Sequence, residues 1–345
     1  MRQSWRFVIP TKRDVLATLS ASMGATRLLE IYQGPRSLIV LNYHRIGNAR
    51  QTPYDSGIFS CTAEELNWQI EWLKRGFSIV NLDQALEMVH AGLTPDRNSI
   101  LLTFDDGYRD NYEQAFQVLR RQQVAGTFFL PTAFVGTGLL PWWDQIAFIV
   151  KSSTKNRIFL SYPEPRALNI TGSHRAQSIR VILDIFKSPK TTDPELFISE
   201  LAKSCGSKRV TGETDRCFLT WDEAREMKRA GMYFGSHTHS HEILSKLPYE
   251  RQVEELETSR AIMERELGGA TDTLAYPVGT PDTFSTDTFQ ALRAARYTTA
   301  FSFYSGVNHP GNIQPFNVLR ANVSPESRAS FRLRIALLAG AGQRL

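Results

Sequence analysis

The sequence predicts an α/β fold in which about seven parallel strands close into an irregular (β/α) barrel. Short apolar runs rich in β-branched and aromatic residues alternate with amphipathic helical patterns along most of the 345 residues. Strands that alternate with helices are typical of parallel sheets buried on both faces, either open doubly wound sheets or barrels. Seven or eight repeats of this unit favour the barrel.

The expected strands are short apolar runs rich in β-branched and aromatic residues. They cover residues 37–43, 78–82, 99–104, 126–130, 232–234, 273–276, 298–303 and 317–323. Apolar residues at every third or fourth position predict helices between them, over 63–75, 112–123, 221–230 and 249–267. Thr220 and Glu223 form a candidate capping box, so one helix is expected to begin directly after Thr220.

We expect three parts along the chain. Residues 1–36 form a basic extension, residues 37–324 the barrel, and residues 325–345 a basic tail. The segment 151–215 interrupts the strand and helix rhythm, because it is polar and has a single clear helical pattern around 179–186. So few large apolar side chains would make a marginal core. We therefore interpret 151–215 as an insertion on the barrel rim, not as a separate domain.

The net charge of +5 is concentrated at the two ends of the chain. Residues 1–36 hold six basic and two acidic side chains and residues 325–345 hold four and one, which leaves the central region slightly acidic. A nucleic-acid-binding protein would spread Lys and Arg over its working face, so we do not expect a nucleic-acid partner. The basic ends suit peripheral contact with an anionic membrane, and the alternative is a helix packed on its own domain.

Composition and cysteine usage indicate a folded chain in a reducing compartment. Hydrophobic residues make up 42% and charged residues 22%, which excludes disordered and low-complexity classes. No apolar run approaches the 18 residues of a membrane span. Three scattered cysteines do not make a disulfide framework, and charges interrupt every apolar stretch near the start, unlike a secretory signal. We expect a cytoplasmic location, and peripheral contact with a membrane is the alternative that the basic ends leave open.

Two adjacent carboxylates follow one of the expected strands. Asp105 and Asp106 come directly after the apolar run 99–104, and Gly107 suits a tight exit from the sheet. Neighbouring residues of a strand point to opposite faces, so a buried Asp pair is costly unless a partner offsets its charge. In parallel barrels the loops at the carboxyl ends of strands build the active site. The alternative is an ordinary turn with solvated carboxylates.

A histidine cluster follows another expected strand. His237, His239 and His241 are three of the seven histidines of the chain. Two imidazoles and one carboxylate form a ligand set typical of hydrolytic metal sites with open coordination positions. The cluster predicts a divalent metal ion, with Zn²⁺ preferred, and the alternative is a polar loop with exposed histidines. The Asp pair and the histidine cluster each follow an expected strand, so we expect both at the same rim of the barrel.

These motifs resemble the polysaccharide deacetylase family, the NodB-homology domain of carbohydrate esterase family 4. The family's first motif matches TFDDG at 103–107, and its second matches His237-Thr238-x-x-His241. The resemblance extends from about residue 37 to residue 323. It implies a NodB-like barrel of about seven strands and metal-dependent removal of an N-acetyl group from a sugar. Carried over residue by residue, it implies that Asp106, His237 and His241 bind the metal and that Asp105 is the general base.

Two family features are missing. The third motif normally supplies an Arg that positions the base, but residues 274–277 read Leu-Ala-Tyr-Pro, and Arg320 on a neighbouring strand is the candidate replacement. The fifth motif normally supplies a catalytic His near the carboxyl end. We expect His44 to serve as the general acid, because it ends the first strand and a circularly permuted barrel would place that strand last. A buried His44 bonded to backbone is the alternative, and His309 is a weaker candidate.

Aromatic residues near the expected rim are candidates for binding a sugar. Trp142 and Trp143 offer faces for stacking, unless they are ordinary core residues, and Tyr276 with Pro277 suits a groove wall. The backbone N–H of Tyr108 could stabilise negative charge on the carbonyl oxygen. The complete predicted substrate-binding set is Tyr108, Trp142, Trp143, Tyr276, Pro277 and Arg320.

The expected substrate is an N-acetylated oligosaccharide or polysaccharide of exopolysaccharide or cell-envelope glycan synthesis. The basic ends would also suit a deformylase or deacylase of a lipid-linked amino sugar. The missing third-motif Arg and fifth-motif His leave a third alternative, a catalytically degenerate barrel that binds glycan.

Overall fold

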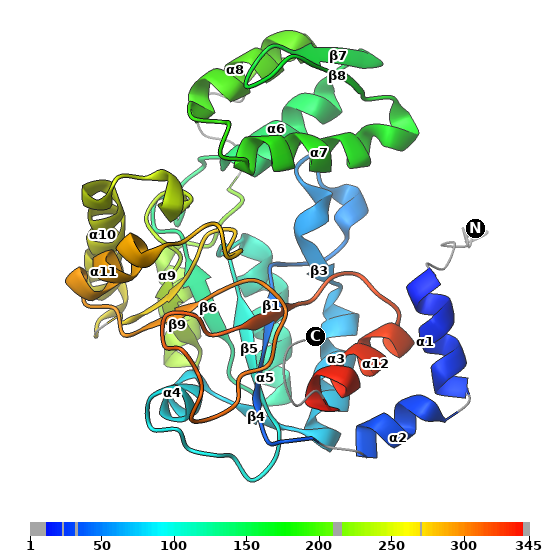
Figure 1. The fold of residues 1–345 in the computed structure, drawn as a ribbon, viewed down its shortest axis with the longest axis vertical. Helices are drawn as coiled ribbons and strands as arrows, with labels where there is room; N and C mark the ends of the chain where they lie inside the picture. Colours follow the sequence, from blue (N-terminus) through cyan, green and yellow to red (C-terminus); the bar gives the residue numbers. More distant parts are fainter. Residues whose placement is uncertain (1–11, 23, 32–33, 210–215, 270, 341–345) are drawn as a thin grey trace.

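Seven parallel strands form a nearly closed barrel at the centre of the molecule (Figure 1). The computed structural model describes residues 12–22, 24–31, 34–209, 216–269 and 271–340. In order around the barrel the strands are β1 (Leu38–Tyr43), β5 (Ser99–Phe104), β6 (Thr127–Leu130), β9 (Tyr233–Ser236), β10 (Thr273–Ala275), β11 (Thr299–Phe301) and β12 (Arg320–Asn322). This arrangement confirms the predicted α/β barrel.

The barrel closes where the last strands meet the first. β12 pairs with β1, and the residues just before β12 pair with β11 through a parallel bridge between Phe301 and Val318. The backbone N–H of Ser302 donates to the carbonyl of Val318 at 2.9 Å. β4 (Ser78–Val80) pairs with β5 outside this ring. The strands of the ring follow chain order, so β1 lies between β5 and β12. That this order is circularly permuted relative to other members of the resembled family stays a prediction.

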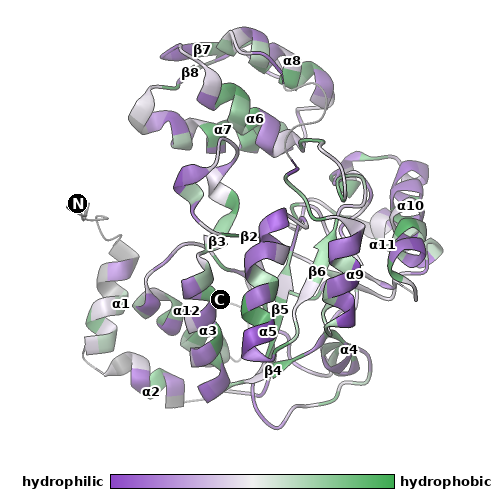
Figure 2. Ribbon diagram, turned by 180° about the vertical axis from the view of Figure 1, so that it is seen from behind, coloured by the Kyte–Doolittle hydropathy of each residue, from purple (hydrophilic) through white to green (hydrophobic). Residues whose placement is uncertain are grey.

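Helices cover the outside of the ring because each buries one apolar face against the strands. They are α3 (Ala63–Gly76), α4 (Leu82–His90), α5 (Gln117–Gln122), α9 (Trp221–Arg229), α10 (Tyr249–Leu267) and α11 (Thr286–Ala294). The predicted capping box of Thr220 and Glu223 is present, and α9 begins at Trp221. The predicted helix over 112–123 is a π-helix, η3 (Asn111–Phe116), followed by α5. Hydrophilic residues alternate with apolar ones along these outer helices (Figure 2).

A second body of structure lies beyond the carboxyl ends of the strands, at the top of Figure 1. It contains α6 (Trp142–Ser152), the hairpin β7 (Arg157–Leu160) and β8 (Arg166–Asn169), η4 (Gly172–His174), α7 (Arg175–Lys187) and α8 (Pro194–Cys205). Its helices bury a hydrophobic cluster of their own that includes Ile146, Ile182 and Phe197. The insertion therefore starts before residue 151 and holds more regular structure than predicted, because apolar side chains of 151–215 combine with those of α6 in one buried cluster.

The segment between β1 and α3 connects the barrel to this insertion. It contains β2 (Arg45–Ile46), η1 (Ala49–Gln51), η2 (Ser56–Ile58) and β3 (Phe59–Cys61). η2 packs against α7, and Lys151 of α6 donates to the carbonyl oxygens of Thr52 (3.1 Å) and Tyr54. Another short helix, η5 (Leu244–Lys246), follows the histidine loop, and Lys246 donates to the carbonyl of Ser188 at 2.8 Å. The insertion is thus tied to the barrel on two sides.

The described helices at the two ends of the chain pack together at the right of Figure 1. They are α1 (Lys12–Ser22), α2 (Ala25–Ile31) and α12 (Arg328–Gly340). Arg332 donates to both carboxylate oxygens of Glu30 at 2.7 and 2.9 Å, and Phe331 packs edge-on against Trp68 of α3. The parts of the predicted extension and tail at 1–11 and 341–345 lie outside the described residues. None of the described helices is both long and apolar enough to cross a bilayer.

Candidate active site

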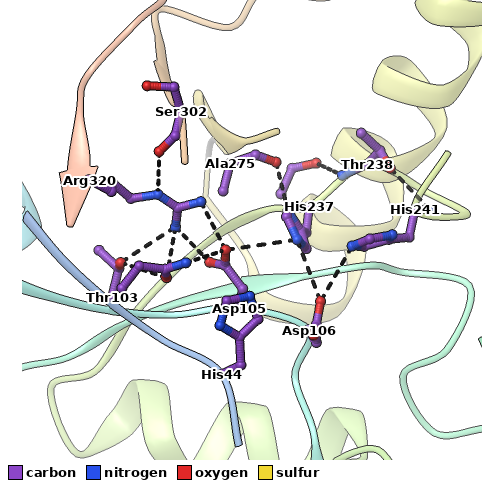
Figure 3. A network of polar contacts seen from close by, with 12 residues as sticks. His44, Thr103, Asp105, Asp106, His237, Thr238, His241, Ala275, Ser302 and Arg320 are labelled. Carbon is purple, nitrogen blue, oxygen red and sulfur yellow. Dashed lines mark hydrogen bonds and ion pairs between the residues drawn. The ribbon is translucent and has the colours of Figure 1, made fainter. Parts of the chain in front are cut away.

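The polar residues singled out by the sequence gather at the carboxyl ends of the strands (Figure 3). Asp105 and Asp106 follow β5, His237 follows β9, and His44 follows β1. β1 and β5 pair in register up to Tyr43 and Phe104, and the N–H of Asp105 donates to the carbonyl of Tyr43 at 2.9 Å. This register places His44 next to Asp105. Because the strands are parallel, all of these side chains meet at one rim.

Asp106, His237 and His241 form the candidate metal site. One ligand atom from each lies within 4.8 Å of the others, and within the described part of the chain no other group of His, Cys, Asp and Glu does so. Asp106 Oδ1 is 3.5 Å from His237 Nε2 and 3.4 Å from His241 Nε2. All three side chains are buried. Two imidazoles and a carboxylate whose ligand atoms converge on one point can bind a divalent cation and leave open positions for water and substrate.

Unusual backbone conformations aim these side chains at one another. Asp106, Thr238 and His241 have φ values of 71°, 64° and 59°, in the left-handed region that residues other than glycine seldom adopt. Such conformations cluster at functional sites because the surrounding structure must hold them. Gly107 follows at φ 65°, and a Cβ there would lie 2.7 Å from a side-chain carbon of Leu130. The glycine of the TFDDG motif is therefore required by both φ and space.

Hydrogen bonds and packing fix the two imidazoles. His237 Nδ1 donates to the carbonyl of Ala275 at 2.7 Å, which leaves Nε2 with a free lone pair facing Asp106. His241 packs against Trp143 with ring centroids 4.3 Å apart, and its Nδ1 is buried without a partner among the described residues. His239 Nδ1 instead lies 2.9 Å from Thr132 Oγ1, so His239 is not part of the metal site.

The ionisation of Asp106 also suits a metal ligand. Burial by itself raises the pKa of this carboxyl, but the close imidazoles of His237 and His241 outweigh burial and hold the pKa well below its ordinary value. A carboxylate must be deprotonated to bind a metal. The site therefore presents one anion and two imidazoles, and these residues fit the metal that the sequence predicts.

Asp105 is held by Arg320 from the far side of β1. Arg320 donates to both carboxylate oxygens at 2.7 and 2.8 Å, and Asn42 of β1 donates to Oδ2 at 3.0 Å. Burial raises the pKa of Asp105, but the guanidinium of Arg320 outweighs this and the pKa is lowered. Arg320 is fully buried and also donates to the carbonyl of Ser302 at 2.8 Å. Arg320 therefore positions the carboxylate of Asp105. It does not bind sugar, contrary to the prediction from the sequence, because it has no exposed surface.

We expect Arg320→Gln to destabilise the fold, because it leaves the buried carboxylate of Asp105 without its cation. Breaking one side of a buried ion pair costs about 3–5 kcal/mol. Urea unfolding of the two proteins measures the difference, and Arg320→Lys, which keeps the charge but not the paired geometry, is expected to fall between them. An unchanged free energy of unfolding for Arg320→Gln would contradict this account of the pair.

His44 points its ring into the site while its backbone is fixed. Its N–H donates to Ser60 Oγ at 2.9 Å, and its carbonyl accepts from Asn111 Nδ2 at 2.8 Å. The imidazole packs edge-on against Phe303, with ring centroids 5.4 Å apart. His309 is not brought to this rim, because its neighbour Asn308 pairs with Leu38 at the opposite end of β1.

A cavity of about 280 Å³ opens between the barrel rim and the insertion. Of the predicted sugar-binding residues, Trp142, Trp143 and Tyr276 line it, whereas Tyr108 and Pro277 are buried beside it and are not part of the lining. Tyr108 instead accepts a hydrogen bond from Trp143 Nε1 at 2.7 Å and donates to Asp144 Oδ2 at 2.7 Å. The complete lining is His44, Asp55, Ile58, Asp105, Asp106, Trp142, Trp143, Leu183, Lys187, His237, His241, Tyr276, Val278, Thr280 and Phe303.

Sequence reasoning missed several residues of this site. Asn42 was detectable, because it is the one strongly polar residue in the buried strand Leu38–Tyr43. Asp55 and Lys187 have no local signal, since each reaches the cavity from a segment whose position depends on the whole fold. Ser302 contributes through its carbonyl oxygen, for which side-chain type gives no information.

The buried carboxyl of Asp144 is expected to make stability depend on pH. Burial raises its pKa to about 7, whereas an unfolded Asp titrates near 3.9. Between these values the folded state binds more protons, so stability falls as the pH rises, by up to ~1.4 kcal/mol per pH unit. We expect the stability of the wild type relative to Asp144→Asn to drop by ~2–4 kcal/mol between pH 4.5 and pH 8 in urea unfolding. Equal differences at the two pH values would contradict the raised pKa.

Comparison with known proteins assigns the family. The polysaccharide deacetylase family model matches residues 92–156 and 175–300, more than half of the chain. The chain belongs to the polysaccharide deacetylase family. The match includes the TFDDG and His-Thr-x-x-His motifs and confirms the resemblance that these motifs indicate.

Curated members of the family match over a shorter part. The poly-β-1,6-N-acetyl-D-glucosamine N-deacetylase of Staphylococcus epidermidis is 30% identical over 113 residues, which cover 29% of this chain and 38% of that protein. The corresponding Staphylococcus aureus protein is 31% identical over 110 residues, 29% of this chain and 38% of its own length. The chain thus spans little more than a third of the curated relatives it matches.

Solved structures of deacetylases share the fold over nearly the whole chain. The Streptococcus pyogenes deacetylase PplD, in complex with acetate, has a TM-score of 0.57 at 16% identity, covering 87% of this chain and 98% of that one. IcaB from Ammonifex degensii has a TM-score of 0.56 at 19% identity, covering 89% and 99%. At these identities the likeness concerns the fold, and it supports the NodB-like barrel of this family member.

Proposed function

We propose that this protein hydrolyses N-acetyl groups from an N-acetylated polysaccharide, with poly-β-1,6-linked N-acetylglucosamine as the favoured class. The proposal rests on one structural feature. The buried candidate metal site of Asp106, His237 and His241 lies beside the Asp105–Arg320 ion pair on the wall of an open cavity. A metal-binding set beside a buried carboxylate is what hydrolysis of an amide requires. The staphylococcal relatives are poly-β-1,6-N-acetyl-D-glucosamine N-deacetylases, which favours that sugar.

Asp106, His237 and His241 would hold the metal, and Zn²⁺ suits their nitrogen and oxygen donors. When bound, such a cation polarises the acetamide carbonyl and makes a water molecule more acidic. Asp105, ionised and held by Arg320, accepts a proton from the attacking water. The remaining hydroxyl bonds to the carbonyl carbon, and the backbone N–H of Tyr108 is the proposed donor to the carbonyl oxygen.

Cleavage of the C–N bond needs a proton for the sugar nitrogen, because an amide anion is too poor a leaving group. We propose His44 as this donor, since it lines the cavity next to Asp105. The C–N electron pair leaves with nitrogen, His44 supplies a proton to it, and the products are acetate and a free amino sugar. Trp142, Trp143 and Tyr276 form the proposed platform for the sugar.

His44→Ala is expected to lower the turnover number by about 10²- to 10⁴-fold, the range for losing one acid–base group. Metal content should stay at one equivalent, because His44 lies outside the Asp106, His237 and His241 set. Initial rates of acetate release and metal analysis of the same sample measure both quantities. Loss of metal together with activity would make His44 a ligand and contradict its role as acid.

The experiment that tests the function is acetate release from defined glycans. Purified protein loaded with Zn²⁺ is incubated with N-acetylated β-1,6-linked glucosamine oligosaccharides, with β-1,4-linked chito-oligosaccharides as the comparison. Acetate from the β-1,6 series supports the proposal. Binding of either series without acetate release would favour the catalytically degenerate barrel, and formate release from a lipid-linked formamido sugar would favour the deformylase alternative. Cytoplasmic location and membrane contact of the basic ends stay predictions from the sequence.

A further inference from the structure

Asp55 is a buried carboxylate on the cavity wall that the proposed chemistry leaves unused. It lies in the segment between β2 and β3, about 50 residues before the Asp pair, and lines the same cavity as His44 and Trp143. Its side chain is 6% exposed. A buried carboxylate is costly unless a partner offsets it, so its position at an open cavity points to a ligand group.

The surrounding structure holds Asp55 in place and leaves part of its carboxylate free. Oδ1 accepts the N–H of Gly57 at 2.7 Å and caps η2. The backbone N–H of Asp55 donates to Asp144 Oδ1 at 2.9 Å, and Asp144 also accepts from Tyr108. Within the described residues, no hydrogen-bond donor reaches Asp55 Oδ2. One oxygen is therefore structural, and the other is available to the cavity.

The unpaired oxygen of Asp55 suits a role as hydrogen-bond acceptor. Burial raises the pKa of Asp55 above its ordinary value, and the N–H of Gly57 and the nearby cations of Lys151, Lys187 and Arg180 offset only part of this rise. These cations favour the ionised form, although none of them forms an ion pair with Asp55 among the described residues. A carboxylate with a free oxygen makes short, strong hydrogen bonds to hydroxyl groups.

Asp55 shares the cavity with two indole rings, those of the half-buried Trp142 and the buried Trp143. Trp142 and Trp143 of α6 line the wall formed by the insertion, and Trp143 packs on His241 of the metal site. Sugar rings present apolar C–H faces and hydroxyl edges, so an aromatic platform with a carboxylate at its edge complements both. We infer that Asp55 binds the substrate's sugar by accepting a hydrogen bond from a ring hydroxyl beside the scissile amide, an inference that rests on the proposed deacetylase function.

The test compares Asp55→Asn with the wild type on two acetyl substrates. Asn keeps the oxygen that caps η2 but removes the charge of the free carboxylate oxygen. Loss of a hydrogen bond to a charged group predicts a fall in kcat/KM of about ten- to a hundredfold on a β-1,6-linked N-acetylglucosamine trisaccharide. p-Nitrophenyl acetate has no sugar hydroxyl, so its hydrolysis should be unchanged. Asp193→Asn, which alters an exposed helix cap at α8, is the matched control and should leave both rates unchanged.

Two results would overturn the inference. One is an unchanged kcat/KM on the trisaccharide, and the other is an equal fall on both substrates, which would indicate a general structural effect. Calorimetric binding of the trisaccharide separates this inference from the proposed function. If the wild type binds the trisaccharide but releases no acetate, the proposed function fails, and weaker binding by Asp55→Asn still supports the sugar contact. Equal affinities of the two proteins, or no binding by the wild type, would overturn the contact.

Discussion

Asp106→Ala is expected to abolish both metal binding and acetate release. Asp106 is the shared partner of the two imidazoles, with Oδ1 at 3.5 Å from His237 Nε2 and 3.4 Å from His241 Nε2. Without the carboxylate, two histidines are left to bind a divalent cation, and the affinity falls. Metal analysis after dialysis measures this loss directly, and acetate release should fall to the background rate.

A thermal unfolding experiment gives a second readout that does not depend on activity. A ligand that binds the folded state alone stabilises it by about 4 kcal/mol at 1,000 times its dissociation constant. Zn²⁺ should therefore raise the unfolding temperature of the wild type and leave that of Asp106→Ala unchanged. His239→Ala is the matched control from the same loop, because His239 contacts Thr132 outside the metal site. An equal response to Zn²⁺ in Asp106→Ala and the wild type would contradict the assignment.

Asp105→Asn is expected to keep the metal and lose turnover by at least about 10²-fold, as is typical for removing a general base. The amide fills the same volume and keeps one oxygen as an acceptor for Arg320, but it cannot take a proton from water. Initial rates and metal content measured on one preparation separate the two effects. A variant with full metal content and full activity would refute the role of Asp105 as base.

The same substitution is expected to lower stability, because Arg320 is fully buried and would lose its anionic partner. Removing one member of a buried ion pair costs about 3–5 kcal/mol. Activity must therefore be measured at a temperature where urea unfolding shows that the variant is folded. If stability falls but the turnover number does not, the Asp105–Arg320 pair serves the fold alone.

Most of the barrel could be predicted because its strands are continuous apolar runs. Local patterns could not distinguish the seven strands of the ring from β4, since Ser78–Val80 has the same composition and pairs with β5 alone. Local patterns also underestimated the extent and the regular structure of the insertion. Phe197, Ile198 and Leu201 of α8 bury one face of that helix, but the core they enter includes α6 residues before the predicted boundary.

The metal site could be predicted because its residues lie in two short motifs, each directly after a strand. The contact of Asp105 with Arg320 joins positions 215 residues apart. Its prediction needs the order of strands around the ring, in which β1 separates β5 from β12. That order also brings Asn42 against both side chains, at 3.0 Å in each case. Asp55 and Lys187 depend in addition on how the insertion sits over the rim.

Anomalous diffraction from crystals of the Zn²⁺-loaded protein tests the central claim most directly. The account predicts one strong peak at about 2.0–2.2 Å from a carboxylate oxygen of Asp106 and from one ring nitrogen each of His237 and His241. A peak that lies elsewhere, or one that any of these three side chains does not contact, would contradict it.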